Sequence, residues 1–171
     1  ELISSALRNG LVRSAVIVCD GAGTVVVTAP DLVQGIGGRV SGIIATSPIP
    51  QVIRRIEDLG GRVLAPATAR IDMPAGAAFA RDLGLSPAAV TVATADDAEA
   101  VRAAHPDALI IAVHTTGVSR EEARRLAAVA DLVTACASAA IREEAGPRAL
   151  LQAGTAVPVF AMTPLGKRVV L

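Results

Sequence analysis

Residues 14–28 read SAVIVCDGAGTVVVT, two short β-branched runs separated by Cys19, Asp20 and two glycines. The first run, 14–19, is predicted to be a buried strand because it is short, continuous and rich in Val and Ile. The second run, 24–28, follows after only four residues. Such a connection is too short for a parallel crossover, so the second strand must form a hairpin with the first or continue it after a bend. The loop between them could be a phosphate-binding loop, a thiol active site or a tight turn.

The glycines of this loop do not match a nucleotide-binding fingerprint. Dinucleotide and P-loop sites need a strand, then glycines, then a helix, whereas Gly21 and Gly23 precede a strand. A second glycine-rich stretch, GIGGRVSG at 35–42, lacks the third glycine of GxGxxG and the Gly-Lys-Ser ending of a P-loop. A tight turn is therefore the better interpretation of Gly21 and Gly23. In the second stretch, Arg39 and Ser41 could still offer two donors to an anion.

Strand-like and helix-like patterns alternate along the rest of the chain. Further strands are expected at 42–47, 62–65, 89–94, 108–114, 131–136, 157–163 and 168–171. Helices are expected at 1–9, 48–59, 74–83, 96–105, 119–130 and 138–145, with Asp96, Ser119 and Ser138 as N-caps. Alternation with short connections predicts an α/β fold: a single three-layer domain over 1–171, with a mostly parallel sheet and helices on both faces. Because the chain starts inside an expected helix, it could be the C-terminal core of a longer protein.

Composition narrows the class of protein. The 171 residues are 52% hydrophobic, almost wholly Ala, Val, Leu and Ile, which suits buried strands covered by helices and requires neither a disulfide nor a metal. Sixteen basic residues balance sixteen acidic ones, so nucleic acid and anionic membranes are not expected partners. Without a long apolar span or a leader segment, we expect a cytoplasmic protein whose two cysteines are thiols. The sequence allows a homo-oligomer.

Polar residues follow several of the expected strands at their carboxyl ends, where open parallel sheets bind ligands. Cys19, Asp20, His114 and Cys136 are the candidate catalytic residues, and Cys19, His114 and Cys136 would also be the ligands if a metal is bound. The candidate ligand-binding residues are Arg39, Ser41, Ser47, Thr94, Thr115, Thr116 and Ser138. The simpler alternative is that both cysteines are core residues, because Cys is among the most buried residue types, and that Asp20 only forms a turn.

Three functional hypotheses follow from these residues. In the first, the protein is an enzyme acting on a small anionic molecule through thiol acid/base or nucleophilic chemistry, with two cysteines on either side of a substrate carbon as in cofactor-independent racemases. In the second, Cys19, Cys136 and His114, with Asp20 as a fourth ligand, hold zinc or an iron–sulfur species. In the third, the protein binds a small ligand, or assembles with a partner, without catalysis.

Three stretches of the chain resemble the family called methanogenesis marker protein 8. They are the run AVIVCDGAGTVVVTAPDLVQGIGGRVSGIIATSPIPQVIRRIEDLGGRVL at 15–64, AVHTTGVSREEA at 112–123 and DLVTACASAAIRE at 131–143. This family occurs mainly in methane-forming archaea, has members that extend further at the N-terminus, and has no established activity. The resemblance implies a link to the cofactors or enzyme maturation of methanogenesis, and it gives no mechanism.

Overall fold

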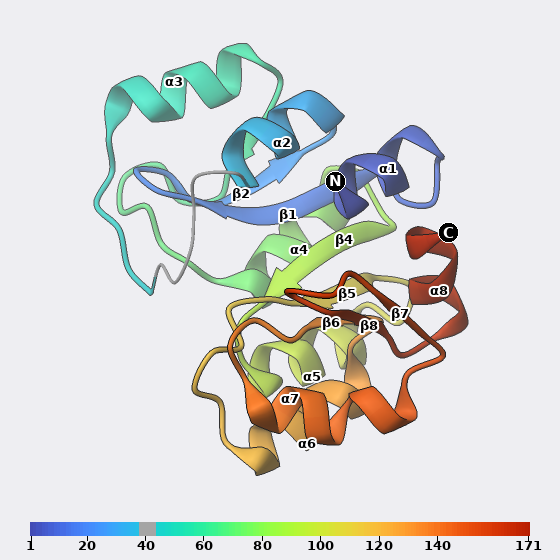
Figure 1. Cartoon of the computed structure of the whole chain (residues 1–171). Coiled ribbons are helices and arrows are strands. Elements are labelled where there is room, and N and C mark those ends of the chain that lie inside the picture. The colour runs from blue at the N-terminus through green and yellow to red at the C-terminus, as the bar shows by residue number, and fades with distance from the viewer. Residues whose placement is uncertain (38–43) are drawn as a thin grey trace. The chain divides into compact units, whose positions relative to one another are not determined.

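The computed structural model of the protein describes residues 1–37 and 44–171 (Figure 1). These residues form two compact units, Glu1–Val90 and Thr91–Leu171, which are described separately below. The expected single domain over 1–171 stays a prediction. Among the described residues, none of the helices is long and apolar enough to cross a membrane.

The strands of the first unit lie in the order β3-β2-β1-β4. Their bounds are β1 (Ser14–Cys19), β2 (Gly23–Val27), β3 (Arg62–Val63) and β4 (Ala88–Val92), and the unit boundary falls inside β4. The first two strands form an antiparallel hairpin, β3 joins β2 antiparallel, and β4 joins β1 parallel. The hairpin predicted from the short connection is therefore confirmed.

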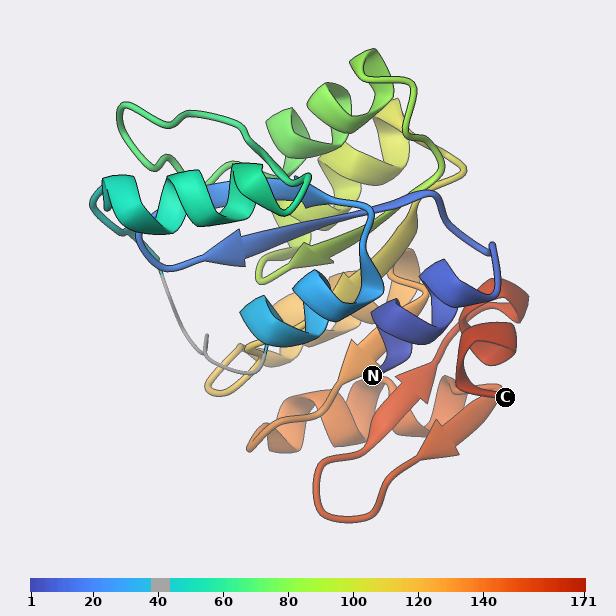
Figure 2. The ribbon, with the colours of Figure 1, turned by 90° about the horizontal axis from the view of Figure 1, so that it is seen from above.

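Helices cover both faces of this hairpin (Figures 1 and 2). They are α1 (Leu2–Arg8), α2 (Pro30–Gly37), α3 (Pro50–Asp58) and α4 (Met73–Asp82). Alternate strand residues such as Ile17 and Val25 point to one face, where they form a core with residues of α1, α2 and α3. On the other face α4 packs closely, because Gly76 brings its backbone against Val16 and Thr24.

The turn between β1 and β2 is held by contacts from two distant segments. Gly21 and Gly23 both have positive φ, +81° and +73°, a region that favours glycine. A Cβ on Gly23 would come within 2.2 Å of the Ala69 carbonyl oxygen, and one on Gly21 within 3.0 Å of Ile49. The Gly21 carbonyl also accepts a hydrogen bond from the Ile49 N–H at 2.8 Å. The glycines are needed for close packing of the turn, which confirms the tight-turn interpretation.

In the second unit the strands lie in the order β5-β6-β8-β7. They are β5 (Leu109–Ala112), β6 (Leu132–Thr134), β7 (Leu151–Ala153) and β8 (Val159–Ala161). The helices are α5 (Ala95–Ala104), α6 (Arg120–Val129), α7 (Ala139–Glu144) and α8 (Pro164–Val170), with a 3-10 turn, η1, at Gly146–Arg148. The β5–β6 pair is parallel, whereas β6–β8 and β7–β8 pair antiparallel.

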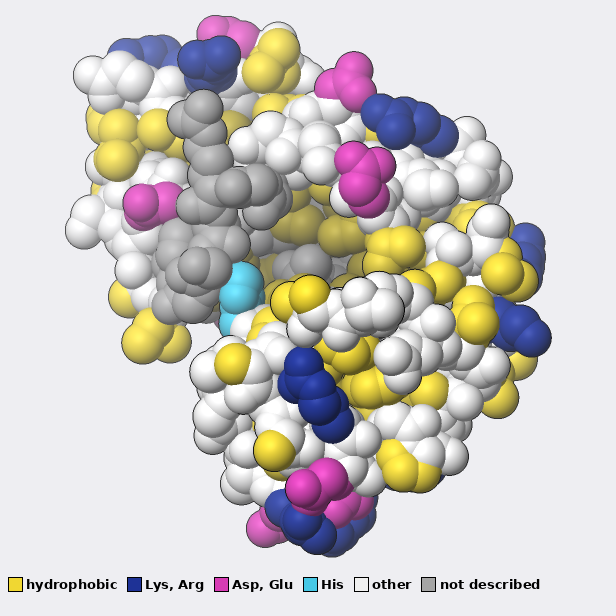
Figure 3. Space-filling model, viewed as in Figure 1, with side chains coloured by type: hydrophobic (Ala, Val, Ile, Leu, Met, Phe, Trp, Pro, Cys, Tyr) yellow, Lys and Arg dark blue, Asp and Glu magenta, His cyan; other side chains and the backbone are white. Residues whose placement is uncertain are grey.

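Ion pairs join the helices of the second unit. Arg125 of α6 pairs with Glu99 of α5 at 2.6 Å, and Arg120 and Arg124 of α6 pair with acidic residues of α7. Figure 3 shows basic and acidic side chains intermingled over α6 and α7. Because each pair has at least one exposed partner, each contributes little to stability.

One buried carboxylate links several elements of the second unit. Asp131 accepts hydrogen bonds from the Arg102 guanidinium at 2.6 Å, the Ile110 N–H at 2.8 Å and the Thr163 hydroxyl at 2.6 Å. Its side chain is only 5% exposed. A buried carboxylate is tolerated because it is fully paired in this way, so it fixes α5, β5 and the start of α8 to one point.

Several expected elements differ from the structure. The sheet pairing is mixed in both units, so the expectation of a mostly parallel sheet is wrong; short connections such as 20–22 and 154–158 leave room only for antiparallel hairpins. The strand expected at 42–47 begins outside the described residues, and its described part, 44–47, is irregular. The strand expected at 168–171 is part of α8, which Thr163 caps. The N-cap of α5 lies two residues earlier than expected, because Thr94 and not Asp96 caps the helix.

Replacing Gly23 by alanine should destabilise the protein by roughly 3 kcal/mol or more, because it adds a backbone clash to the cost of a positive φ. Gly10 is the matched control: its φ is +67°, and a Cβ there meets nothing within 4 Å. Gly10→Ala should therefore cost only about 1 kcal/mol. Urea unfolding followed by circular dichroism measures both changes. Equal losses would show that the close approach at Gly23 is unimportant.

Candidate functional site

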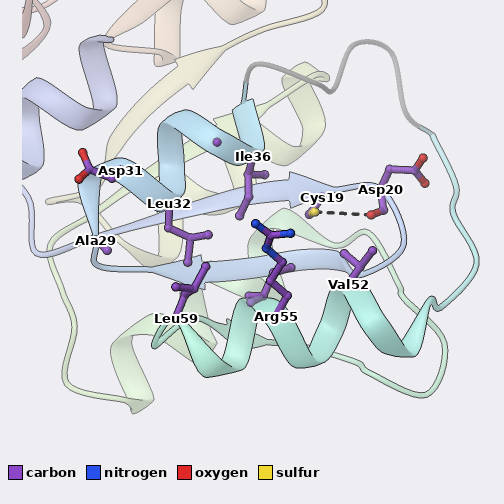
Figure 4. Close-up of a pocket in the computed structure, with 11 residues that line it drawn as sticks. Cys19, Asp20, Ala29, Asp31, Leu32, Ile36, Val52, Arg55 and Leu59 are labelled. Atoms are coloured by element: carbon purple, nitrogen blue, oxygen red, sulfur yellow. Dashed lines mark hydrogen bonds between the residues drawn. The ribbon is translucent and has the colours of Figure 1, made fainter.

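The first unit contains a pocket of about 680 Å³ between α2, α3 and the end of β1 (Figure 4). Its wall is mostly aliphatic, with a thiol and three charged side chains. The lining residues are Cys19, Asp20, Ala29, Asp31, Leu32, Gly35, Ile36, Val52, Arg55, Ile56 and Leu59. All of them belong to the first unit. The carboxyl end of β1, where the sequence predicted a ligand site, therefore forms one side of the pocket through Cys19 and Asp20.

The pocket forms because α2 and α3 both pack on the β1–β2 hairpin but leave a gap between them. Ile36 and Ile56 are buried against the core, at 7% and 3% exposure, and form the inner wall. Leu59, toward the end of α3, is 54% exposed although it is apolar. A Cβ on Gly35 of α2 would meet nothing within 4 Å. The two helices therefore present apolar side chains to empty space.

Cys19 stands at the pocket as a protonated thiol. Burial raises the pKa of Cys19, and the negative charge of Asp20 raises it further. Its Sγ lies 3.5 Å from the Asp20 carbonyl oxygen, to which the thiol donates. Since the thiolate is the nucleophilic form, Cys19 is suited to donate a proton and poorly suited to attack an electrophile at neutral pH.

Asp20 has a structural partner. Its carboxylate accepts a hydrogen bond from the Thr46 hydroxyl, and the Thr46 oxygen in turn accepts one from the Gly21 N–H at 2.9 Å. Asp20 thus helps to anchor the segment before α3 to the β1–β2 turn. It also lines the pocket, so the turn role and the candidate catalytic role are compatible.

In the second unit, His114, Thr115 and Cys136 gather at the carboxyl ends of the parallel strands β5 and β6. His114 and Cys136 both have positive φ, +56° and +45°, which is uncommon for residues other than glycine. The Arg142 guanidinium donates to the Cys136 carbonyl at 3.1 Å and holds this segment in place. Strained backbone of this kind clusters at functional sites.

Cys136 differs from Cys19 in its acidity. Burial by itself would raise the pKa of Cys136, but hydrogen bonds outweigh it and the pKa is lowered. The bonds come from the Thr134 hydroxyl, from the backbone and hydroxyl of Thr115, and from the backbone of His114. The Thr134 oxygen lies 3.5 Å from Sγ. The Thr134 hydroxyl also donates to the Ala112 carbonyl, and the Thr115 hydroxyl donates to the Thr134 carbonyl. The backbone N–H groups are therefore the donors that remain available to a thiolate.

Burial lowers the pKa of His114, which favours the neutral imidazole at neutral pH. A neutral imidazole can accept a proton or ligate a metal. Within each unit, the described residues include no group of three or more His, Cys, Asp and Glu arranged to hold a metal ion. Cys19 belongs to the first unit, and His114 and Cys136 belong to the second. The three-ligand metal site and the two-thiol arrangement therefore stay predictions.

Several candidate ligand-binding residues have local structural partners. Thr94 and Ser138 accept hydrogen bonds from the first turns of α5 and α7, and the Thr116 hydroxyl accepts from the Ala137 N–H at 3.3 Å. Thr115 is fully buried. Ser47 is exposed in the segment before α3. Arg39 and Ser41 lie outside the described residues. Ligand binding by each of these side chains stays a prediction.

The α2 side of the pocket and Arg55 of α3 were not among the residues predicted from the sequence. The signal was present: Pro30 and Asp31 are favourable first-turn residues, and Leu32, Val33 and Ile36 follow at helical spacing. The glycines at 35 and 37 favoured a loop interpretation of this stretch instead.

The two thiols should react with iodoacetamide over different pH ranges, because only the thiolate reacts. In the Cys19→Ser variant, alkylation of Cys136 should rise at lower pH than alkylation of Cys19 in the Cys136→Ser variant. At neutral pH, Cys136 should therefore react faster. Mass spectrometry of timed samples gives the rates; a reversed order would contradict the assigned acidities.

Comparison with known proteins shows one family and one curated relative. The chain is 42% identical over 174 aligned positions to the uncharacterized protein MJ0054 of Methanocaldococcus jannaschii, which it matches over its whole length. That alignment covers 61% of the relative, so the chain spans about three fifths of the relative's length. No solved structure matches. Residues 1–171 match the family described as an uncharacterized protein conserved in archaea, DUF2099, and the chain belongs to that family.

Proposed function

We propose that the protein binds a small molecule in the pocket between α2 and α3. The pocket itself is the observation that carries the proposal. Its volume of about 680 Å³ falls in the range of small-molecule sites, and such sites are lined by apolar side chains with a few polar groups. Exposed apolar surface on Leu59 and the open space beside Gly35 support it, because an occupant would cover the first and fill the second.

Cys19 gives this binding site a chemical group. A ligand in the pocket would contact a thiol that holds its proton at neutral pH. The thiol could donate that proton to a carbon or oxygen atom of the ligand, which is general acid catalysis. We therefore retain the enzyme hypothesis in the form of proton donation by Cys19, with simple binding as the alternative. Cys19→Ser should leave ligand binding intact under either hypothesis. If the protein is an enzyme, the same variant should abolish turnover.

A second candidate function is thiolate chemistry at Cys136. The specific observation is the lowered pKa of this thiol, together with the left-handed backbone at Cys136 and His114. A lowered pKa increases the fraction of thiolate, which can remove a proton or add to a carbonyl carbon, forming an S–C bond as the C=O π electrons move to oxygen. The neutral His114 imidazole is suited to accept a proton in such a reaction.

We also propose that DUF2099 membership reflects the narrower kinship suggested by the sequence, with methanogenesis marker protein 8. The runs at 15–64, 112–123 and 131–143 support it. The curated relative comes from Methanocaldococcus jannaschii. This kinship would place the protein in the cytoplasm and connect the pocket ligand with the small molecules of that metabolism. The balanced charge supports a small-molecule partner over nucleic acid or a membrane surface.

The pocket can be filled from Gly35 without disturbing the core. Gly35→Leu places an isobutyl group in the open space and should weaken binding of the neutral, apolar fluorophore phenylnaphthylamine roughly tenfold or more. Gly35→Ala is the matched control: it also removes a helical glycine but fills little volume, so affinity should stay within about twofold. Fluorescence titration gives the affinities, and circular dichroism verifies folding. Equal affinity in both variants would overturn the proposed binding function.

A further inference from the structure

The charges on the pocket wall indicate what kind of ligand it takes. Three charged side chains line it: Asp20, Asp31 and Arg55. Asp20 accepts a hydrogen bond from Thr46, and Asp31 pairs with Arg8 at 2.9 Å. Both acidic groups are therefore partnered within the protein.

Arg55 is different. Its guanidinium forms no hydrogen bond or ion pair with any residue that the structure describes. Figure 4 shows its side chain reaching from α3 into the space between α3 and α2. An arginine carries five N–H donors and a charge that persists at every physiological pH. Arg55 is an exposed residue whose guanidinium is accessible to a ligand, and a carboxylate matches its planar fork with two parallel hydrogen bonds.

The apolar wall indicates the chemical character of the rest of the ligand. Val52, Ile56 and Leu59 follow one face of α3 with Arg55, at spacings of three and four residues. Across the gap, Leu32 and Ile36 of α2 lie one helical turn apart. From Val52 to Leu59 the α3 stripe extends about 10 Å at the rise of an α-helix. A linear or branched aliphatic body of that length would be covered on two sides.

The number of charges matters as well. One guanidinium can neutralise one negative charge, while Asp20, which forms no ion pair with a described residue, repels a second one. A single carboxylate is therefore favoured over a dianion such as a phosphate monoester. We propose that the ligand is an amphipathic monocarboxylate, with its carboxylate on Arg55 and its aliphatic body between α2 and α3. This inference rests on the proposed binding function and names its ligand class.

Displacement of bound phenylnaphthylamine from the full chain tests the class. Octanoate should displace the dye, with octanol and octyl phosphate each about fivefold weaker, because the alcohol lacks the charge and the phosphate carries a second one. Arg55→Gln should weaken octanoate about fivefold and leave octanol unchanged. Arg54→Gln is the matched control: Arg54 is the neighbouring arginine on the same helix and is exposed like Arg55, but it does not line the pocket, so octanoate binding should be unaffected.

The outcomes separate the two proposals. If octanol and octanoate compete equally in the wild-type protein and in Arg55→Gln, the monocarboxylate class is wrong while dye binding in the pocket stands. If octyl phosphate binds best and Arg55→Gln removes that preference, the site takes phosphate esters and the class is again wrong. If Gly35→Leu leaves dye binding unchanged, both the class and the proposed binding function are overturned, because the dye then sits elsewhere.

Discussion

The first unit depends on a turn that has no room for side chains at Gly21 and Gly23. Between β1 and β2, Gly21 meets Ile49 and Gly23 meets the backbone of Ala69, and both glycines adopt positive φ. The turn is therefore packed from two directions by segments some 25 to 50 residues later in the chain. Each contact is possible only because a Cβ is missing. Local backbone geometry and long-range packing impose the same requirement on the same two positions.

The pocket follows from this turn. Ile49 immediately precedes α3, and its N–H bonds to the Gly21 carbonyl, so the start of α3 is attached to the end of the hairpin. The helix then runs along the sheet face that α2 also covers. Two helices anchored independently on one hairpin need not touch each other along their lengths. The gap between them, with Cys19 and Asp20 at the turn, is the place where a ligand can reach the strand end.

The sequence predicted the strands better than their pairing. Apolar runs located β1, β4, β5 and β6, and the rule that ligands bind at strand ends pointed to Cys19 and Asp20. The antiparallel pairing of several strands was not predicted, because hydrophobic periodicity identifies a strand but does not indicate which strand it pairs with or in which direction. The run RVVL at 168–171 predicts a strand because four residues are too few to show a helical period, although Thr163 and Pro164 mark a helix start. The pKa values of the two cysteines are shifted in opposite directions. The difference depends on hydrogen-bond donors that the tertiary fold brings to Cys136, and no local sequence pattern contains this information.

The aliphatic core has an optical consequence. With no Trp or Tyr, the chain has almost no near-ultraviolet absorbance or fluorescence of its own. Folding and ligand binding therefore cannot be followed by intrinsic fluorescence or near-ultraviolet absorbance, as they are in most proteins. The same feature means that a single tryptophan introduced at Gly35 would supply nearly all of the fluorescence. Its emission wavelength would report whether the gap between α2 and α3 holds water or an aliphatic ligand.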